Sequence, residues 1–226
     1  MPDTYPLYDI TPFTALDYPD HLAAILWFAG CNMRCDFCYN VDIVFGKGSI
    51  SIDDALAFLQ TRRGLLDGVV LSGGEATLYD DLPKLCRQIK ALGFKIKLDT
   101  NGMLPGMIET LVTEKLLDYI ALDYKAPPQK FAAVTKNRHY EHFAKTLKFL
   151  IASDVEFEVR TTLHPDLLGE EDINLIIADL EAKHYKGSYY LQHFLMADKT
   201  IGELERPKKM FDSSKVSDAI PIYYRN

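Results

Sequence analysis

Residues 30–40 have the sequence GCNMRCDFCYN, and the three cysteines in it decide the interpretation of the whole chain. The thiols stand at Cys31, Cys35 and Cys38, directly after an apolar run, Ala23–Phe28, that predicts a strand. A tight loop at a strand end can direct three thiolates to three corners of an iron–sulfur cube, because soft sulfur ligands suit iron. A [4Fe-4S] cube has four irons, so this spacing predicts one iron that no side chain fills.

Two other interpretations of the cysteines are weaker. A structural zinc site needs a fourth protein ligand, and the remaining cysteine, Cys86, lies on the apolar stripe of a predicted helix, where a thiol packs as a small hydrophobe. A redox dithiol would use only two of the three thiols. The open iron–sulfur cube is therefore the preferred hypothesis.

Length, composition and charge exclude several classes of protein. The 226 residues are 48% hydrophobic, which suits one domain with a sizeable core. The formal net charge of −7 opposes polyanions, so neither nucleic acid nor an anionic membrane is an expected partner. The longest apolar run, residues 22–30, is shorter than the ~20 residues that span a bilayer, and residues 1–9 carry no signal-peptide pattern. We therefore expect a cytoplasmic protein with cysteines that are thiols or metal ligands.

Apolar runs alternate with helical patterns along most of the chain. Helices are predicted around residues 52–59, 82–89, 107–114, 140–147 and 173–180, where apolar residues recur at i, i+3, i+4 and i+7. The predicted strands between and around them are Ala23–Phe28, Gly68–Leu71, Lys95–Leu98, Tyr119–Leu122, Val155–Thr162 and Ser188–Phe194. This order predicts an α/β fold with six βα units and a parallel sheet.

The fifth predicted strand bears on whether the sheet is open or curved into a partial barrel. Val155, Phe157 and Val159 alternate with charged residues at 156, 158 and 160, so one face is apolar and the other charged. A partial (β/α)6 barrel with a working lumen would use the charged face, and an edge strand exposed to solvent would explain it equally well. We assign residues 1–196 to the barrel with an N-terminal extension. Residues 197–226 show no sustained period and are predicted to be a tail that packs on the barrel or docks a partner.

Polar residues recur where successive predicted strands end. Ser72-Gly73-Gly74-Glu75 follows the second strand, and Asp99-Thr100-Asn101-Gly102 closes the third. Asp123-Tyr124-Lys125, Arg160 and Gln192-His193 end the fourth, fifth and sixth. Each alone is explained better by a helix cap or a surface ion pair, but ligands bind at the carboxyl ends of parallel strands, so their recurrence predicts a ligand site.

The cysteine spacing, Phe37 before the last cysteine and the Gly73–Glu75 turn resemble the radical S-adenosylmethionine (SAM) superfamily. The resemblance implies a [4Fe-4S] cluster held by the three cysteines and SAM bound at the open iron. Glu75 would bind the amino group of SAM, Lys125 and Arg160 its carboxylate, and Asp99, Thr100 and Asp123 a monovalent cation. The implied cofactor-binding residues are Tyr39, Gly73, Gly74, Glu75, Asp99, Asn101, Asp123, Lys125, Arg160 and His193.

Three further stretches, residues 11–19, 30–35 and 161–165, resemble anaerobic ribonucleoside-triphosphate reductase activating proteins. This resemblance implies an enzyme that generates a glycyl radical on a partner, with electrons from a flavodoxin or ferredoxin-type reductant. The alternatives are a pyruvate formate-lyase-type activase and a small-molecule radical SAM enzyme such as 7-carboxy-7-deazaguanine synthase. An iron–sulfur electron carrier or a zinc-stabilised binding module would leave Glu75, Lys125 and Arg160 without a common purpose.

Overall fold

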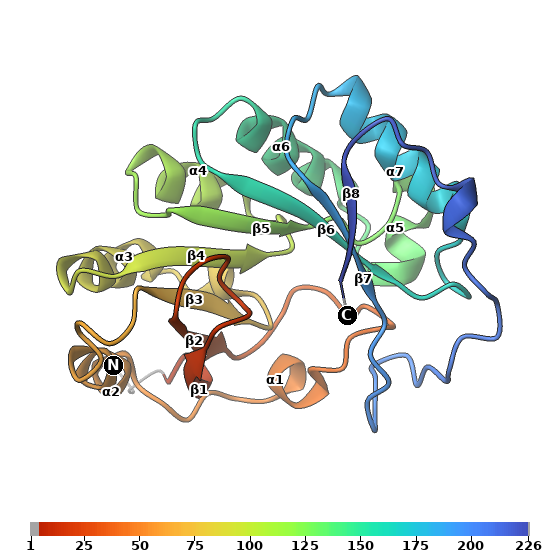
Figure 1. Ribbon diagram of the computed structural model, residues 1–226. Coiled ribbons are helices and arrows are strands. Elements are labelled where there is room, and N and C mark those ends of the chain that lie inside the picture. Colours follow the sequence, from red (N-terminus) through yellow and green to blue (C-terminus); the bar gives the residue numbers. More distant parts are fainter. Residues whose placement is uncertain (1–4, 226) are drawn as a thin grey trace.

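Eight strands form one curved sheet in which the spatial order of the strands follows their order along the chain (Figure 1). The computed structural model describes residues 5–225. Strands β2 to β7 are parallel, and they are the six strands that the sequence predicts. The strands are β1 Leu7–Thr14, β2 Ala23–Phe28, β3 Gly68–Gly73, β4 Lys95–Thr100, β5 Tyr119–Asp123, β6 Phe157–Leu163, β7 Tyr189–His193 and β8 Ile222–Arg225.

Helices cover the convex side of the sheet and leave its concave side as a lumen (Figure 1). The five predicted helices are present, and the structure adds α1 and α5, which are short. Ser51 caps α2 with a reciprocal side-chain bond to Asp54, a pattern that fixes a helix start. The helices are α1 Val41–Phe45, α2 Ile52–Gln60, α3 Leu82–Ala91, α4 Pro105–Thr113, α5 Pro128–Thr135, α6 Tyr140–Ile151 and α7 Glu170–Ala182, with 3-10 turns η1 Ala76–Leu78 and η2 Ser213–Lys215.

The two edge strands were not predicted. β1 runs antiparallel to β2, with Leu7 opposite Phe28 and Thr14 opposite Ala23. β8 runs parallel to β7, with Gln192 beside Arg225, so the tail is not devoid of regular structure as its sequence suggested. Within the described residues β1 and β8 do not pair with each other, and the barrel stays open between them.

The main core lies between the sheet and the helices, and a smaller apolar cluster lies inside the curve. Tyr18, Ala23, Ile25 and Val70 form this second cluster, and Ile25 and Val70 line the central cavity. On β6, Val159 is fully buried in the main core, whereas Glu158 and Arg160 line the central cavity. Since β6 pairs with strands on both sides, the lumen interpretation of its charged face is confirmed and the edge-strand alternative is wrong.

Among residues 5–225 we find no helix whose length and apolar character would let it cross a bilayer.

Candidate active site

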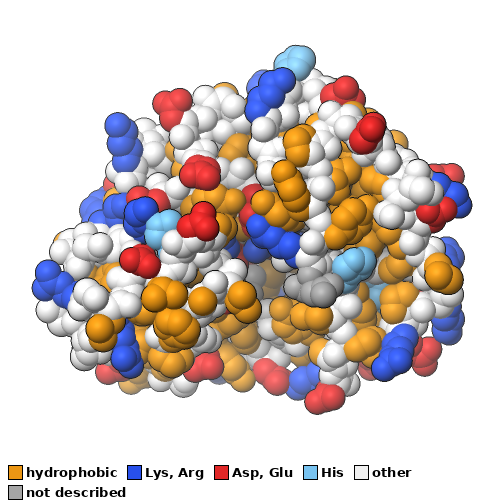
Figure 2. All heavy atoms as spheres, in the orientation of Figure 1, with side chains coloured by type: hydrophobic (Ala, Val, Ile, Leu, Met, Phe, Trp, Pro, Cys, Tyr) orange, Lys and Arg blue, Asp and Glu red, His pale blue; other side chains and the backbone are white. Residues whose placement is uncertain are grey.

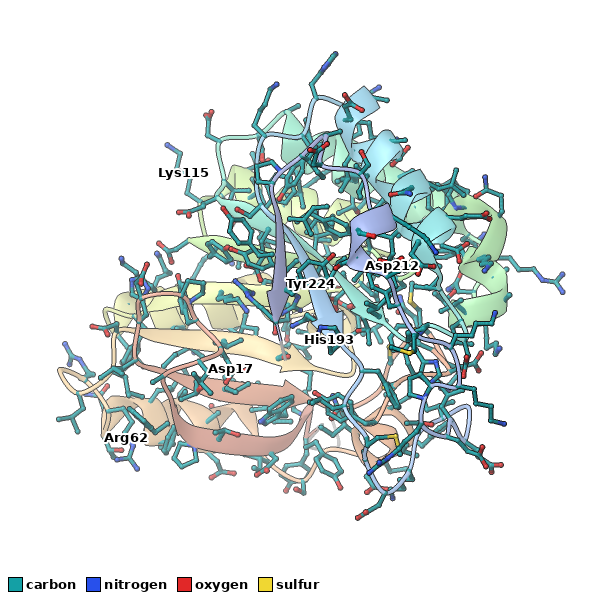
Figure 3. All side chains as sticks on the ribbon, turned by 45° about the vertical axis from the view of Figure 1, so that its right-hand side comes forward. Asp17, Arg62, Lys115, His193, Asp212 and Tyr224 are labelled. Carbon is teal, nitrogen blue, oxygen red and sulfur yellow. The ribbon has the colours of Figure 1, made fainter. Side chains whose placement is uncertain are left out.

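A cavity of about 450 Å³ lies at the carboxyl ends of the parallel strands. The predicted cysteines and the predicted cofactor-binding residues all line it, which brings together positions from 31 to 193. Figure 3 shows Asp17, on the β1–β2 connection, and His193, at the end of β7, on either side of the opening. In Figure 2 the surface is hollowed near the middle of the view, beside hydrophobic and basic side chains.

The loop Cys31–Cys38, called the cysteine loop below, follows β2 and carries all three thiols into this cavity. Cys35 is buried and the other two are half-buried. The Cys38 N–H donates to the Cys35 carbonyl at 2.9 Å, which turns the loop tightly. One side of the loop is fixed by the last turn of α5, because the Asp36 N–H donates to the Val134 carbonyl at 3.1 Å.

The environment of the thiols suits ligands that lose their protons only when they bind metal. Burial raises the pKa of Cys31 to about 11 and that of Cys35 to about 12, and it also raises the pKa of Cys38. Lys125 opposes the rise at all three and supplies positive charge that would balance thiolates. Lys125 Nζ also lies 5.5 Å from the centre of the Phe37 ring, so the loop and the end of β5 are in contact.

The three thiols form a soft donor set on one short loop that lines the cavity. Thiolates are the usual ligands of iron–sulfur clusters, so this donor set suits such a cluster. Within residues 5–225, no three His, Cys, Asp or Glu side chains are arranged to hold one metal ion. Cys86 is fully buried in the main core and does not line the cavity, as predicted.

Glu75 joins the ends of β3 and β4 through a buried set of hydrogen bonds. Its carboxylate accepts from the Thr77 N–H at 3.2 Å and hydroxyl at 2.5 Å, from the Thr100 hydroxyl at 2.8 Å and from the Asn101 N–H at 2.8 Å. Burial raises the pKa of Glu75, and these donors oppose the rise. Three of these bonds end on Oε1 and one on Oε2, so Oε2 keeps acceptor capacity. The role of Glu75 as the acceptor for an amino group therefore stays a prediction, and the structure adds that Glu75 holds these two turns together.

The ordered turn leads directly to the cysteine loop. Asn101, whose N–H is held by Glu75, donates from Nδ2 to Asn32 Oδ1 at 2.8 Å, and the same atom lies 3.8 Å from Cys31 Sγ. Gly74 comes so close to the loop that an added Cβ would lie 1.9 Å from the Gly30 carbonyl oxygen. Only glycine allows this approach. The strand-end turns and the cysteine loop therefore form one unit.

A chain of charges follows the lumen from β4 to β6. Arg160 Nε donates to Asp123 at 3.0 Å, its Nη1 lies 3.6 Å from Asp99, and Lys125 donates to Asp123 at 3.0 Å. Although burial opposes it, Arg160 and Lys125 hold the pKa of Asp123 below its usual range. Lys97, a buried lysine that the sequence analysis missed, pairs with Asp99. These five side chains, three cations and two carboxylates, therefore carry a formal charge of +1 as a group.

The monovalent-cation site at Asp99, Thr100 and Asp123 stays a prediction, and the structure shows which partners these residues have without a ligand. Asp99 and Asp123 already share Arg160, whose guanidinium supplies the positive charge between them. The Thr100 hydroxyl donates to Glu75 instead of joining the two aspartates.

A second ion pair in the lumen was also missed. Glu158, with its side chain 2% exposed, accepts two hydrogen bonds from Arg225 at 2.8 and 3.0 Å and one from the Tyr119 hydroxyl at 3.0 Å. Arg225 lies over the Tyr190 ring, 3.4 Å from its centre. The charged face of residues 155–160 hinted at Glu158, but nothing in the tail sequence pointed to Arg225.

Two predicted residues lie at the mouth of the cavity. Tyr39 is half-exposed directly after the cysteine loop, and His193 is exposed and stacks on Tyr224 with 6.0 Å between the ring centres. Leu195, shortly after β7, and Leu16, on the β1–β2 connection, are exposed residues that also line the cavity.

Comparison with known proteins gives activating enzymes and also a small-molecule enzyme, the 7-carboxy-7-deazaguanine synthase of Halobacterium salinarum, which is 40% identical over 33% of this chain and 29% of its own length. A model of the Radical SAM superfamily matches residues 25–176. A Methanocaldococcus jannaschii protein named as a candidate glycyl-radical enzyme activating enzyme is 33% identical over 73% of this chain and 70% of its own length. The pyruvate formate-lyase 1-activating enzyme of Escherichia coli K12 is 30% identical over 66% of this chain and 63% of its own.

The fold also matches solved structures at low sequence identity. The crystal structure of Streptococcus suis SuiB bound to S-adenosylmethionine superposes with a TM-score of 0.68 at 14% identity. The match covers 89% of this chain and 52% of SuiB, so the chain spans about half the length of that neighbour.

Proposed function

Because the chain belongs to the radical SAM superfamily, we propose that it is an activating enzyme that generates a glycyl radical on a partner, anaerobic ribonucleoside-triphosphate reductase. The observation that carries this proposal is the convergence of three thiols and the strand-end charges on one cavity. When bound, the [4Fe-4S] cluster and SAM supply a reductive cleavage that yields a 5′-deoxyadenosyl radical able to abstract a hydrogen atom. This chain's residues bind, orient and shield those groups.

Cys31, Cys35 and Cys38 are the proposed cluster ligands. They leave one iron for the amino and carboxylate groups of SAM. The surplus positive charge among Lys97, Lys125, Arg160 and their two aspartates would balance the SAM carboxylate. Gly73 and Gly74 would let the backbone approach the amino group, with Glu75 holding their turn in shape. Tyr39, Asn101 and His193 complete the proposed contacts.

A polypeptide is the proposed substrate because the cavity opens at the side. Among residues 5–225 the sheet does not close between β1 and β8, and the cavity lining includes exposed apolar residues, Leu16 being 93% exposed. Such a rim suits a protein partner. A small-molecule enzyme such as 7-carboxy-7-deazaguanine synthase would favour a more enclosed lumen.

The choice of partner rests on the resemblance of residues 11–19 and 161–165. A pyruvate formate-lyase-type partner is the competing candidate, favoured by the 30% identity to the Escherichia coli activase. The proposed electron donor is a flavodoxin or ferredoxin-type protein. A cytoplasmic location belongs to the same proposal, since all four cysteines are free thiols.

The test is anaerobic reconstitution with iron and sulfide, followed by reaction with SAM and dithionite. The proposal expects 5′-deoxyadenosine, and a glycyl doublet in electron paramagnetic resonance (EPR) when the reductase is present. Cys35→Ala is expected to abolish both, whereas Cys86→Ala, which changes a core thiol, keeps both. 5′-Deoxyadenosine without a doublet on either candidate partner would contradict the activase assignment, and no 5′-deoxyadenosine at all would contradict the radical chemistry.

A further inference from the structure

The cysteine loop is held on a second side by the tail, about 160 residues further along the chain. The Ile201 N–H donates to the Cys38 carbonyl at 2.9 Å, and the Gly202 N–H donates to the Asp36 carbonyl at 2.9 Å. Asp36 therefore uses its N–H towards α5 and its carbonyl towards the tail. One of the two accepting residues is Cys38 itself, and the other, Asp36, lies between Cys35 and Cys38.

The tail forms a tight turn at this contact. The Glu203 N–H donates to the Thr200 carbonyl at 3.1 Å, and the Leu204 N–H donates to the Thr200 hydroxyl at 2.7 Å. Thr200 is 6% exposed, although it stands in a segment with little other burial. Residues 200–204, called the tail turn below, are thus held in shape by their own hydrogen bonds, in addition to their bonds to the cysteine loop.

Glycine at position 202 is required by close approach. An added Cβ would lie 2.6 Å from Asp36 Cβ and 2.8 Å from Asp36 Cα, about 1 Å inside an ordinary carbon contact. Because one of these atoms belongs to the backbone, a rotamer change cannot relieve the clash. Either the tail turn or the cysteine loop must move when position 202 gains a side chain.

We propose that the tail turn is a positioning element for the cluster, with Gly202 as its key residue. It acts on the backbone between Cys35 and Cys38, so that both thiols keep the spacing that an iron–sulfur cube needs. Outer residues that orient metal ligands commonly change metal affinity or activity by about 10–100-fold. This inference rests on the proposed cluster ligands.

The experiment compares two valine substitutions at glycines. Gly202→Val places its side chain against Asp36, whereas the control Gly187→Val meets the Tyr185 hydroxyl, outside the residues that line the cavity. Both full-length variants are reconstituted anaerobically. Three quantities are measured, namely iron content, the rate of cluster bleaching by a chelator, and the EPR spectrum of the reduced cluster. The melting temperature of each cluster-free variant gives its fold stability.

We expect Gly202→Val to lose its cluster to the chelator about tenfold faster than the unmodified protein, with an altered EPR spectrum, whereas Gly187→Val keeps the unmodified rate and spectrum. Thr200→Val, which removes the hydroxyl acceptor without adding bulk, should shift the rate in the same direction by less. It also serves as the test if Gly202→Val does not fold.

Two results would overturn the proposal. One is an unmodified rate and spectrum in a folded Gly202→Val. The other is equal cluster loss in both glycine variants at equal loss of melting temperature, because that is general destabilisation. A wrong assignment of the cluster ligands would give a different result, because Cys35→Ala would then retain the full iron content of the unmodified protein.

Discussion

Replacing Glu75 by glutamine tests the hydrogen-bond network that joins the strand ends to the cysteine loop. Glutamine keeps the shape but has one oxygen and one NH2 group. If the glutamine oxygen accepts from Thr77 and Thr100, the glutamine NH2 group faces the Asn101 N–H. Two buried donors then point at each other, and neither has an acceptor. One unsatisfied buried donor costs about 1–3 kcal/mol. Removal of a buried charge offsets part of the loss of the charge-assisted bonds, so we expect a net destabilisation of about 1–3 kcal/mol.

For a chain of 226 residues, each kcal/mol corresponds to about 2–4 °C in melting temperature. Thermal unfolding of the cluster-free Glu75→Gln variant, followed by circular dichroism, should therefore show a fall of several degrees. Because Asn101 also binds Asn32, the same variant should hold its reconstituted cluster less tightly. A melting temperature within 1 °C of that of the unmodified protein would refute the conclusion that the variant leaves buried donors without acceptors, whatever happens to the cluster.

Two further predictions follow from other ion pairs, and a third follows from a backbone hydrogen bond to a carboxylate. Arg225→Met leaves the buried Glu158 carboxylate with one partner, the Tyr119 hydroxyl. The free energy of unfolding in urea should fall by about 3 kcal/mol, the low end for a broken buried pair, because Arg225 is 35% exposed. A fall of less than 1 kcal/mol would contradict this. Arg160→Lys cannot reach both aspartates, so the KM for SAM should rise about tenfold while the fold persists; an unchanged KM would exclude that role. The N–H of Lys208 donates to Asp166 and holds the pKa of this carboxyl below its ordinary value of about 4. The contact therefore stabilises the fold above about pH 4, and this contribution is lost as the pH falls through the lowered pKa. The NMR amide shifts of residues 208 and 209 should change with pH across the lowered pKa, and they should not change in Asp166→Asn.

The sequence predicts the parallel part of the fold because its signals are local. Six apolar runs alternate with helical periods, and each strand pairs with its neighbour in the chain. β1 was missed because its eight residues show no clean alternation of burial. β8 has four residues and only partly buried side chains, so its position depends on β7 and on the Arg225–Glu158 pair. Neither kind of contact leaves a periodic trace in the sequence.

The sequence predicted which residues line the site better than it predicted which of them form hydrogen bonds and ion pairs with one another. Strand-end positions such as Asp99, Asp123 and Arg160 follow from topology, since parallel strands end at one edge. Which of them pair with one another depends on side-chain reach, so the position of Arg160 between Asp99 and Asp123 could not be predicted from the sequence. For the same reason Glu75, which a pattern presents as a ligand contact, holds the surrounding turns together.

The sequential strand order also bears on how the protein is made. During synthesis each of the strands β2 to β8 can pair with the strand that left the ribosome just before it, so the sheet can grow from one end. The cysteine loop leaves the ribosome about 160 residues before Gly202, whose N–H binds its Asp36 carbonyl. The hydrogen bonds between the tail turn and the loop can therefore form only after β3 to β7 have been synthesised.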